Sequence, residues 1–392
     1  MVSIIGEIIP EAASPVAPIL IFVLAASASV LLIVFLFRRF KRYGDYAYTN
    51  ARVSAMKGEL KENDKLDPLV QTQNLQSFIS LLNETDYASY LDNSDAEPIQ
   101  VEWALKASLA DTCTKIYSIA PENVSNIFQE LGKIVTVENI KILLSSKFVK
   151  KSSEEIEERL FPEQFLPEDV YEKVLKSENL DEALAAFEET EYWGSINEVL
   201  SEVEESKNLL PLWTKIEQKF WEDAIRKARN SSAKGSKVIR EAIGMKIDIM
   251  NILTVLRCLN QNTNAKKIEK NHIPIYSKIG EEDLERAMEM EGVKEAVVNL
   301  EDSYYGEKLS EGLEEYRKTG SVYSFEKSLY EFFIKNMRTM SIQNSAGAGP
   351  LTAFFFRKRI EVRNLITIAN GISEDLPSEK INESLIKVGE TR

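Results

Sequence analysis

Hydrophobic residues in this chain recur with the 3.6-residue period of an α-helix. Apolar side chains fall at positions i, i+3, i+4 and i+7 in two clear stretches, Ile249, Ile252, Leu253 and Leu256 in one and Val362, Leu365, Ile366 and Ala369 in the other. This spacing gives a helix one apolar face that can pack on a core. Glycine and proline are few, with 16 and 12 copies in 392 residues, so we predict an all-α fold in which sheet is minor or absent.

One apolar segment near the N-terminus has a different pattern. No charged residue occurs from Val16 to Phe37, and a helix over residues 19–37 would be about 28 Å long, close to the thickness of a bilayer's hydrocarbon core. A basic cluster follows at once, consisting of Arg38, Arg39, Lys41 and Arg42. Because such charges favour the cytoplasmic side, we predict an extracytoplasmic N-terminus at 1–15, a transmembrane helix at 16–37 and the bulk of the chain on the cytoplasmic face of the cell membrane.

A cleaved signal peptide and a wrongly chosen start codon are the alternatives to this anchor. A signal peptide would carry positive charge before its apolar run, whereas Glu7 and Glu11 precede the run here and the basic cluster follows it. The order of charges therefore favours the anchor.

Three stretches of the chain have similar sequences at nearly equal spacing. The block from Lys246 to Val255 matches the block from Arg359 to Ile368 in chemistry at every position except one, and a weaker copy runs from Val137 to Leu144. The asparagines of these copies are 112 and 113 residues apart, at Asn139, Asn251 and Asn364.

A second motif keeps a similar spacing and ends each time in a tyrosine, at Tyr87, Tyr192 and Tyr305. Repeats of solenoid proteins are only roughly 20 to 50 residues long. The much longer period of this chain predicts three related lobes, each built from several helices.

Short polar or glycine-containing turns precede the repeated helices, at 230–236 and 345–350, and they guide the placement of the domain boundaries. After the transmembrane helix we predict a basic juxtamembrane segment at 38–44, helical lobes at 45–130, 131–235 and 236–345, and a closing helix with the C-terminal tail at 346–392.

The polar residues of the repeats suit a structural role. Asp248 and Glu361 each lie three positions before a repeated asparagine and flank the apolar stripe, so their side chains could cap or bridge a neighbouring helix. We interpret them as structural hydrogen-bonding groups, used once per lobe. The three tyrosines end acidic turns, where a tyrosine can bury its ring and keep its hydroxyl wet. We interpret them as packing residues, with an aromatic interface contact as the alternative.

Composition narrows the classes of function. The net charge is −14 and the pI is about 5.0, which would repel a nucleic-acid backbone, and we expect no basic patch to offset this repulsion. The two cysteines, Cys113 and Cys258, have no metal or redox spacing, and His272 is the only histidine. Because no nucleophile elbow, zinc motif or phosphate-binding loop is present, we predict no catalytic, cofactor or metal site and no small-molecule substrate.

Three separated motifs resemble one known family. They are the segment Tyr46–Lys57, which contains Asn50, the segment Ile247–Arg257, and Gly349–Leu351 together with Arg357–Asn370. In this order they resemble the C subunit of the archaeal A-type ATP synthase, which is also called the V/A-type. They are also similar to the d subunit of eukaryotic V-ATPases. The resemblance covers about residues 45–371.

The resemblance implies a funnel of three pseudo-equivalent helical lobes, seated on the cytoplasmic face of a membrane rotor ring. Its partners would be the central axle subunits of D and F type and the proteolipid ring, between which it would transmit torque without chemistry.

Two features depart from the family pattern. The first asparagine copy lacks the aromatic and aspartate pair expected there. The transmembrane helix is also a departure, and we hypothesise that it enters the lumen of the ring. A membrane-anchored helical scaffold or tether without a rotary role is the alternative.

Overall fold

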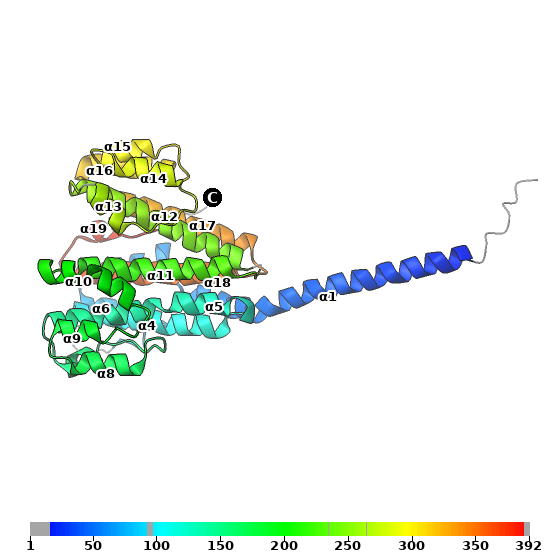
Figure 1. Ribbon diagram of the computed structural model, residues 1–392, viewed down its shortest axis with the longest axis horizontal. Helices are drawn as coiled ribbons and strands as arrows, with labels where there is room; N and C mark the ends of the chain where they lie inside the picture. Colours follow the sequence, from blue (N-terminus) through cyan, green and yellow to red (C-terminus); the bar gives the residue numbers. More distant parts are fainter. Residues whose placement is uncertain (1–15, 92–96, 234, 264, 388–392) are drawn as a thin grey trace, which may run out of the picture. The chain divides into compact units, whose positions relative to one another are not determined.

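The computed structural model describes the chain in two compact units, Met1–Tyr48 and Thr49–Arg392 (Figure 1). The described backbone covers residues 16–91, 97–233, 235–263 and 265–387. Within it, side chains are described except at 16–20, 38–43 and 266–267.

Helices are the only regular elements among these residues, which confirms the predicted all-α class. Their bounds are α1 Val16–Glu59, the 3-10 helix η1 Asn63–Lys65, α2 Asp67–Val70, α3 Leu75–Leu82, α4 Pro98–Ile119, α5 Glu122–Gly132, α6 Ile134–Phe148, α7 Ser153–Glu157, α8 Glu168–Lys176, α9 Leu180–Ala185, α10 Trp193–Ser206, α11 Leu210–Asn230, α12 Ser236–Asn260, α13 Ala265–Asn271, α14 Glu281–Met288, α15 Val293–Asn299, α16 Gly306–Thr319, α17 Tyr323–Gln343, α18 Gly349–Ser373 and α19 Ser378–Glu383.

The first unit contains most of α1. Its described apolar side chains, from Ile21 to Phe37, are all exposed. Among the residues that the structure describes, no helix was found with the length and apolar character needed to cross a membrane. The transmembrane helix predicted at 16–37 is therefore not confirmed. Residues 1–15 lie outside the described part of the chain, as do the side chains of Arg38, Arg39, Lys41 and Arg42.

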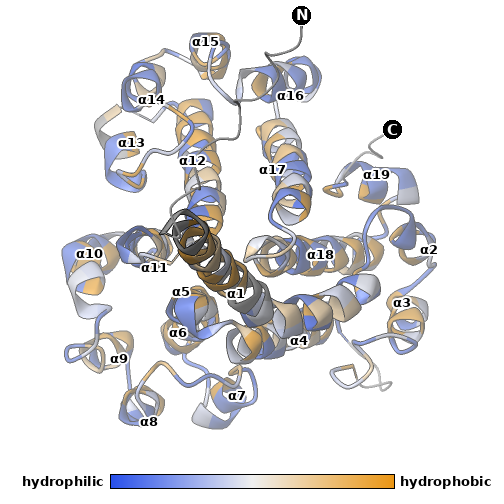
Figure 2. Ribbon diagram, turned by 90° about the vertical axis from the view of Figure 1, so that its right-hand side faces the viewer, coloured by the Kyte–Doolittle hydropathy of each residue, from blue (hydrophilic) through white to orange (hydrophobic). Residues whose placement is uncertain are grey.

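Long helix hairpins dominate the second unit. α4 is followed by the returning pair α5 and α6, α11 by α12, and α17 by α18, and the turns of all three lie at the same end of the unit (Figure 1). The short helices α8, α9 and α13 to α15 lie outside the long ones (Figure 2). The chain enters the unit at its turn-bearing end, since the Thr49 hydroxyl donates to the carbonyl of Ile119.

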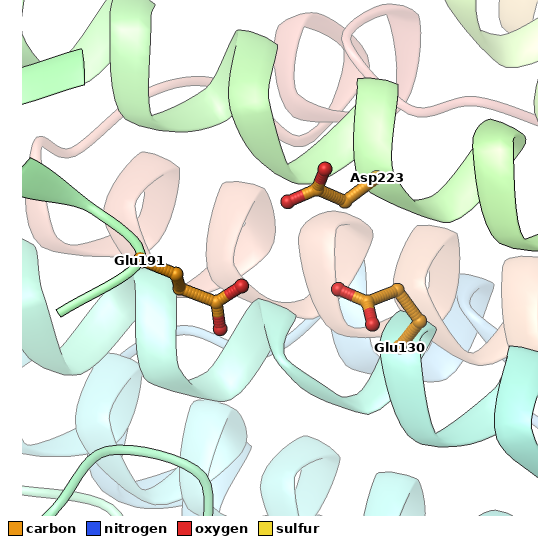
Figure 3. Close-up of side chains that lie close together, drawn as sticks. All are labelled: Glu130, Glu191 and Asp223. Atoms are coloured by element: carbon orange, nitrogen blue, oxygen red, sulfur yellow. The ribbon is translucent and has the colours of Figure 1, made fainter. Parts of the chain in front are cut away.

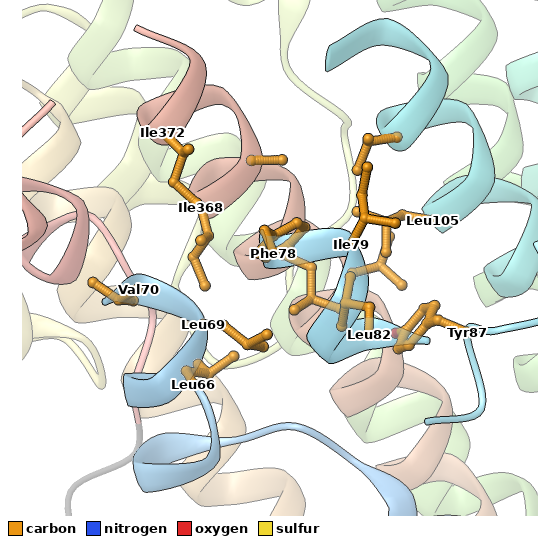
Figure 4. Packing of buried hydrophobic residues seen from close by; sticks show 14 of the residues in the cluster. Leu66, Leu69, Val70, Phe78, Ile79, Leu82, Tyr87, Leu105, Ile368 and Ile372 are labelled. Carbon is orange, nitrogen blue, oxygen red and sulfur yellow. The ribbon is translucent and has the colours of Figure 1, made fainter. Parts of the chain in front are cut away.

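One hydrophobic cluster joins the beginning and the end of the second unit. It brings residues between 66 and 91 and between 101 and 105, in and around α2, α3 and α4, together with residues between 362 and 385, in and around α18 and α19. Phe78, Leu82 and Tyr87 are fully buried in it, and Phe78 lies between Leu82 and Ile368 of α18 (Figure 4). Burying one such side chain is worth about 1.5–3 kcal/mol, so the cluster fastens α18 to the first helices of the unit. The predicted lobe boundaries, which separate these segments, stay a prediction.

Candidate functional site

The repeated asparagines form the same contact three times. Each is almost fully buried, and its side-chain amide meets the backbone 22 residues later, where Nδ2 donates to the carbonyl and Oδ1 accepts from the N–H. The pairs are Asn139 with Phe161, Asn251 with Ile273 and Asn364 with Ile386, at 2.8–3.0 Å. These asparagine clamps satisfy buried donors and acceptors that would otherwise be costly. Each clamp holds a loop against a long helix.

Asp248 binds the continuation of the second loop. Its carboxylate accepts from three successive backbone N–H groups, those of Ser277, Lys278 and Ile279, at 2.7–3.3 Å. The hydroxyl of Tyr305 donates to the same carboxylate at 2.9 Å. Burial raises the pKa of Asp248 above its usual range despite these bonds. The side chain thus links α12, the loop and the start of α16.

The first copy makes the equivalent contact with a different acid. Thr136 stands where the acid would be, and its hydroxyl donates to Glu163 at 2.7 Å. Glu163 accepts from the backbone N–H groups of Phe165 and Leu166 and from the hydroxyl of Tyr171. Sequence reasoning missed Glu163. The only signal was the threonine in place of an acid, because the substitute lies on the loop instead of the helix.

The third copy is completed by residues from the beginning of the unit. Glu361 accepts from the backbone N–H of Lys61 at 2.9 Å, and Lys358 Nζ lies 3.2 Å from its second oxygen. The same ammonium contacts Asp86 at 3.0 Å and lies 4.4 Å from the ring centre of Tyr87. Burial raises the pKa of Glu361, although the charge of Lys358 opposes the rise.

The three repeated tyrosines lie in identical turns. Each is buried, and its backbone N–H donates to the hydroxyl two residues earlier, at 3.2–3.3 Å: Thr85 for Tyr87, Thr190 for Tyr192 and Ser303 for Tyr305. Their hydroxyls were expected to stay wet, but those of Tyr87 and Tyr305 are buried. Burial raises the pKa of both phenols. The tight helix packing around each turn excludes water from these groups.

Asn50 has a different role from the other asparagines. Its Nδ2 donates to the carbonyls of Ser345 and Gly347, at 2.8 and 3.2 Å. These carbonyls belong to the turn between α17 and α18. Asn50 therefore ties the entry of the chain to that turn.

Three carboxylates meet between α5 and α11, those of Glu130, Glu191 and Asp223 (Figure 3). Their nearest oxygens lie within 4.8 Å of one another, a spacing that could suit a metal ion. Two lysines supply the compensating charge: Lys133 lies 3.2 Å from Glu130 and 2.8 Å from Glu191, and Lys219 lies 2.7 Å from Asp223. We interpret the group as an ion-pair network that joins the two helices.

A partly buried ion pair fixes the beginning of the unit to α18. Arg357 donates from Nε to Glu62 at 2.8 Å and from Nη2 to the second oxygen, and Arg338 contacts that oxygen at 3.2 Å. Burial alone would raise the pKa of Glu62, but the hydrogen bonds and charge of the two arginines lower it below its usual range.

A cavity of about 300 Å³ lies between α4, α6 and α18. Charged side chains of Lys106, Glu138, Arg359 and Arg363 line it beside apolar residues such as Ile134. Lys106 Nζ lies 3.4 Å from Glu138. The cavity thus combines charged and apolar side chains.

The second unit also contains the match to a known family. The model of the ATP synthase (C/AC39) subunit family matches residues 49–384, beginning at the first residue of that unit. The chain belongs to this family. The family prediction made from the three motifs is thus confirmed.

Several archaeal members of the family are similar over most of their length. The A-type ATP synthase C subunit of Methanocaldococcus jannaschii is 30% identical over 346 residues, which cover 88% of this chain and 86% of the relative. The C subunit of Methanothermobacter thermautotrophicus is 33% identical, with 87% of both chains covered. The C subunit of Thermococcus kodakarensis is 26% identical, with 87% of this chain and 90% of the relative covered.

Proposed function

We propose that this protein is a non-catalytic central-stalk subunit of an A-type ATP synthase. In this role it couples the membrane proteolipid ring to the axle subunits of D and F type, so that ion-driven rotation drives ATP synthesis. The observation that carries the proposal is the family match over residues 49–384, which spans nearly the whole second unit. The relatives from archaeal A-type ATP synthases support the same assignment.

The repeated contacts suit a part that transmits torque. Such a part must resist deformation, and buried hydrogen bonds and ion pairs between distant segments resist it. The asparagine clamps, the ion pair of Glu62 with Arg357 and the contacts of Glu361 provide them. We propose that they hold three lobes in a funnel, one of which is assembled from the two ends of the second unit.

We also propose that residues 16–37 anchor the protein in the membrane with the N-terminus outside. The exposed apolar side chains from Ile21 to Phe37 support this anchor. A protein that rotates with the ring cannot carry an anchor through the surrounding lipid past the stator. The anchor would therefore enter the lumen of the ring, with Arg38, Arg39, Lys41 and Arg42 near its rim.

The proposal is tested by solubilising native membranes gently, purifying the protein by affinity through a C-terminal tag and identifying the co-purified proteins by mass spectrometry. Recovery of the nucleotide-binding head subunits together with the ring proteolipid is expected. Recovery of neither would leave a membrane-anchored scaffold as the function. Crosslinking from residues 16–37 then tests the lumen position, and crosslinks found only to stator or lipid-exposed surfaces would reject it.

A further inference from the structure

Acidic residues are missing from two parts of this acidic protein. The chain has 62 aspartates and glutamates in 392 residues, about one in six, yet residues 224–240 and 332–360 contain none. These segments include the turn between α11 and α12 and the turn between α17 and α18, which lie at the same end of the second unit (Figure 1). The first contains six basic residues.

Several of these cations lack an acidic partner. Lys227, Arg229 and Lys237 are exposed, and none makes an ion pair within the described part of the chain, whereas Arg226 pairs with Asp223. Some exposed lysines on other helices do have a partner one turn away: Lys173 pairs with Asp169, and Lys176 pairs with Glu172. The hairpin of α11 and α12 thus presents positive charge that its own helices do not neutralise.

The neighbouring turn adds an apolar group. Ile342, near the end of α17, is 75% exposed, and the turn that follows, from 343 to 349, carries no charge. We call Lys227, Arg229, Lys237 and Ile342 the basic end of the unit. Exposed cations at the same end of a protein as an exposed apolar side chain are typical of surfaces that lie on a membrane interface.

The chain enters the second unit at the basic end. Thr49 and Asn50 are bonded to the turns at this end, through the carbonyls of Ile119 and Ser345. Only twelve residues earlier lies Phe37, the last residue of the uncharged run. Such a connection reaches no farther than about 40 Å even when fully extended.

We infer that the basic end lies on the cytoplasmic membrane surface and binds the phosphates of anionic phospholipid headgroups. A net charge of −14 would otherwise keep the protein away from an anionic leaflet, so the local excess of positive charge turns this end toward the lipid. The inference rests on the proposed anchor and is independent of the rotary role.

The test uses the full chain, reconstituted without other subunits into vesicles of phosphatidylcholine alone or with added phosphatidylglycerol. A fluorophore is attached at Ser232→Cys, an exposed position in the α11 and α12 turn, after Cys113→Ala and Cys258→Ala. Quenching by a headgroup nitroxide lipid reports contact. We expect several-fold stronger quenching with phosphatidylglycerol, which high salt reduces because it screens the charges.

Charge reversal identifies the residues responsible. The double change Lys227→Glu and Arg229→Glu should abolish the additional quenching, whereas the control pair Lys270→Glu and Lys294→Glu, which alters two other exposed cations by the same charge, should keep it. If the protein floats with the vesicles but its quenching is the same with and without phosphatidylglycerol, the lipid-binding inference is overturned and the anchor stands. Failure of the protein to float would overturn the anchor as well. Quenching that needs the ring proteolipid would assign the basic end to a protein partner instead.

Discussion

A carboxamide carries both donors and an acceptor, and the buried amides of Asn139, Asn251 and Asn364 use both kinds of group on one backbone position. An ionised aspartate cannot donate, leucine does neither, and a serine or threonine would have to donate and accept through one oxygen atom. The requirement explains why asparagine stands at this position in all three copies. The acid three positions earlier is variable for a different reason. A carboxylate can reach the loop from the helix, as that of Asp248 does, or belong to the loop itself, as that of Glu163 does.

The clamp can be tested with an almost isosteric change. Asn251→Asp should lower the free energy of unfolding by about 2 kcal/mol or more, because the carbonyl of Ile273 loses its donor and a charge is buried. Asn197→Asp, at an exposed position of α10, should change it by less than about 0.5 kcal/mol. Urea unfolding of the full chain in detergent, followed by circular dichroism, measures both. Equal midpoints for the two variants would contradict the role of the clamp.

The ion pair of Glu62 should make stability depend on pH in one direction. Its pKa is lowered in the folded protein from the ordinary 4.5, so its contribution is fully present above about pH 4.5 and is lost as the pH falls through the lower folded value. Glu62→Gln should therefore unfold more easily than the wild type at pH 7, with the difference shrinking in acid. Urea midpoints from pH 7 to pH 3 measure this difference.

The exposed Glu59 gives the control, since Glu59→Gln should follow the wild-type profile. Asp248 and Glu361 act in the opposite direction, because their raised pKa values make the folded state gain protons first. Because Asp248 and Glu361 are present in the variants and in the wild type, comparing urea midpoints at the same pH cancels their effect and leaves that of Glu62. A difference that stays constant from pH 7 to pH 3 would contradict the assignment.

At the scale of elements, helix starts repeat together with the tyrosine turns. The short helices α3, α9 and α15 begin after N-cap residues Asn74, Asn179 and Gly292, each 13 positions before the repeated tyrosine. The two asparagine side chains accept from backbone N–H groups of the first turn. Each helix, its turn and its tyrosine therefore form one unit that is repeated with the clamps.

Close packing between α16 and α17 can be tested at a glycine. A Cβ atom at Gly312 would lie 2.7 Å from the ring of Phe325 and 3.0 Å from its Cα, so Gly312→Ala should destabilise the protein by about 1–2 kcal/mol through overpacking. At Gly194 on α10 nothing lies within 4 Å, and Gly194→Ala should stabilise by up to about 1 kcal/mol from helix propensity. Thermal unfolding midpoints should move in opposite directions. A rise in both would show that the two helices can separate slightly.

At the scale of the whole molecule, the second unit is closed by its two ends. Lys61 and Asp86 contact α18 through Glu361 and Lys358, and one hydrophobic cluster contains residues from both ends of the second unit. Consecutive segments build the other two copies. The third copy forms only when residues about 300 positions apart meet.

Removing α18 should therefore disrupt the first helices of the unit as well. A chain ending at residue 345 should show fast amide exchange and proteolytic cleavage within residues 66–105, since Phe78 and Leu82 lose their partners on α18. A chain ending at residue 387 keeps α18 and α19, and its residues 66–105 should stay protected. Native protection of residues 66–105 in the shorter chain would show that they fold without α18.

The amino-acid sequence by itself determined the features that depend on local order. Helical periodicity is a property of neighbouring residues, so the all-α class followed from it. The equal spacing of Asn139, Asn251 and Asn364 revealed the repeat, and three separated motifs indicated the family. The apolar run from Val16 to Phe37 is equally plain in the sequence, but its membrane role stays a proposal.

Only the tertiary structure decided which distant groups meet. It placed Glu163 in the role of the missing acid of the first copy, closed the third copy with Lys61 and gathered two acid-free turns at one end. The physical reason is that a carboxylate or a cation can reach the same place from different segments of the chain. Residue type and spacing leave that choice open, whereas the packing of long helices fixes it.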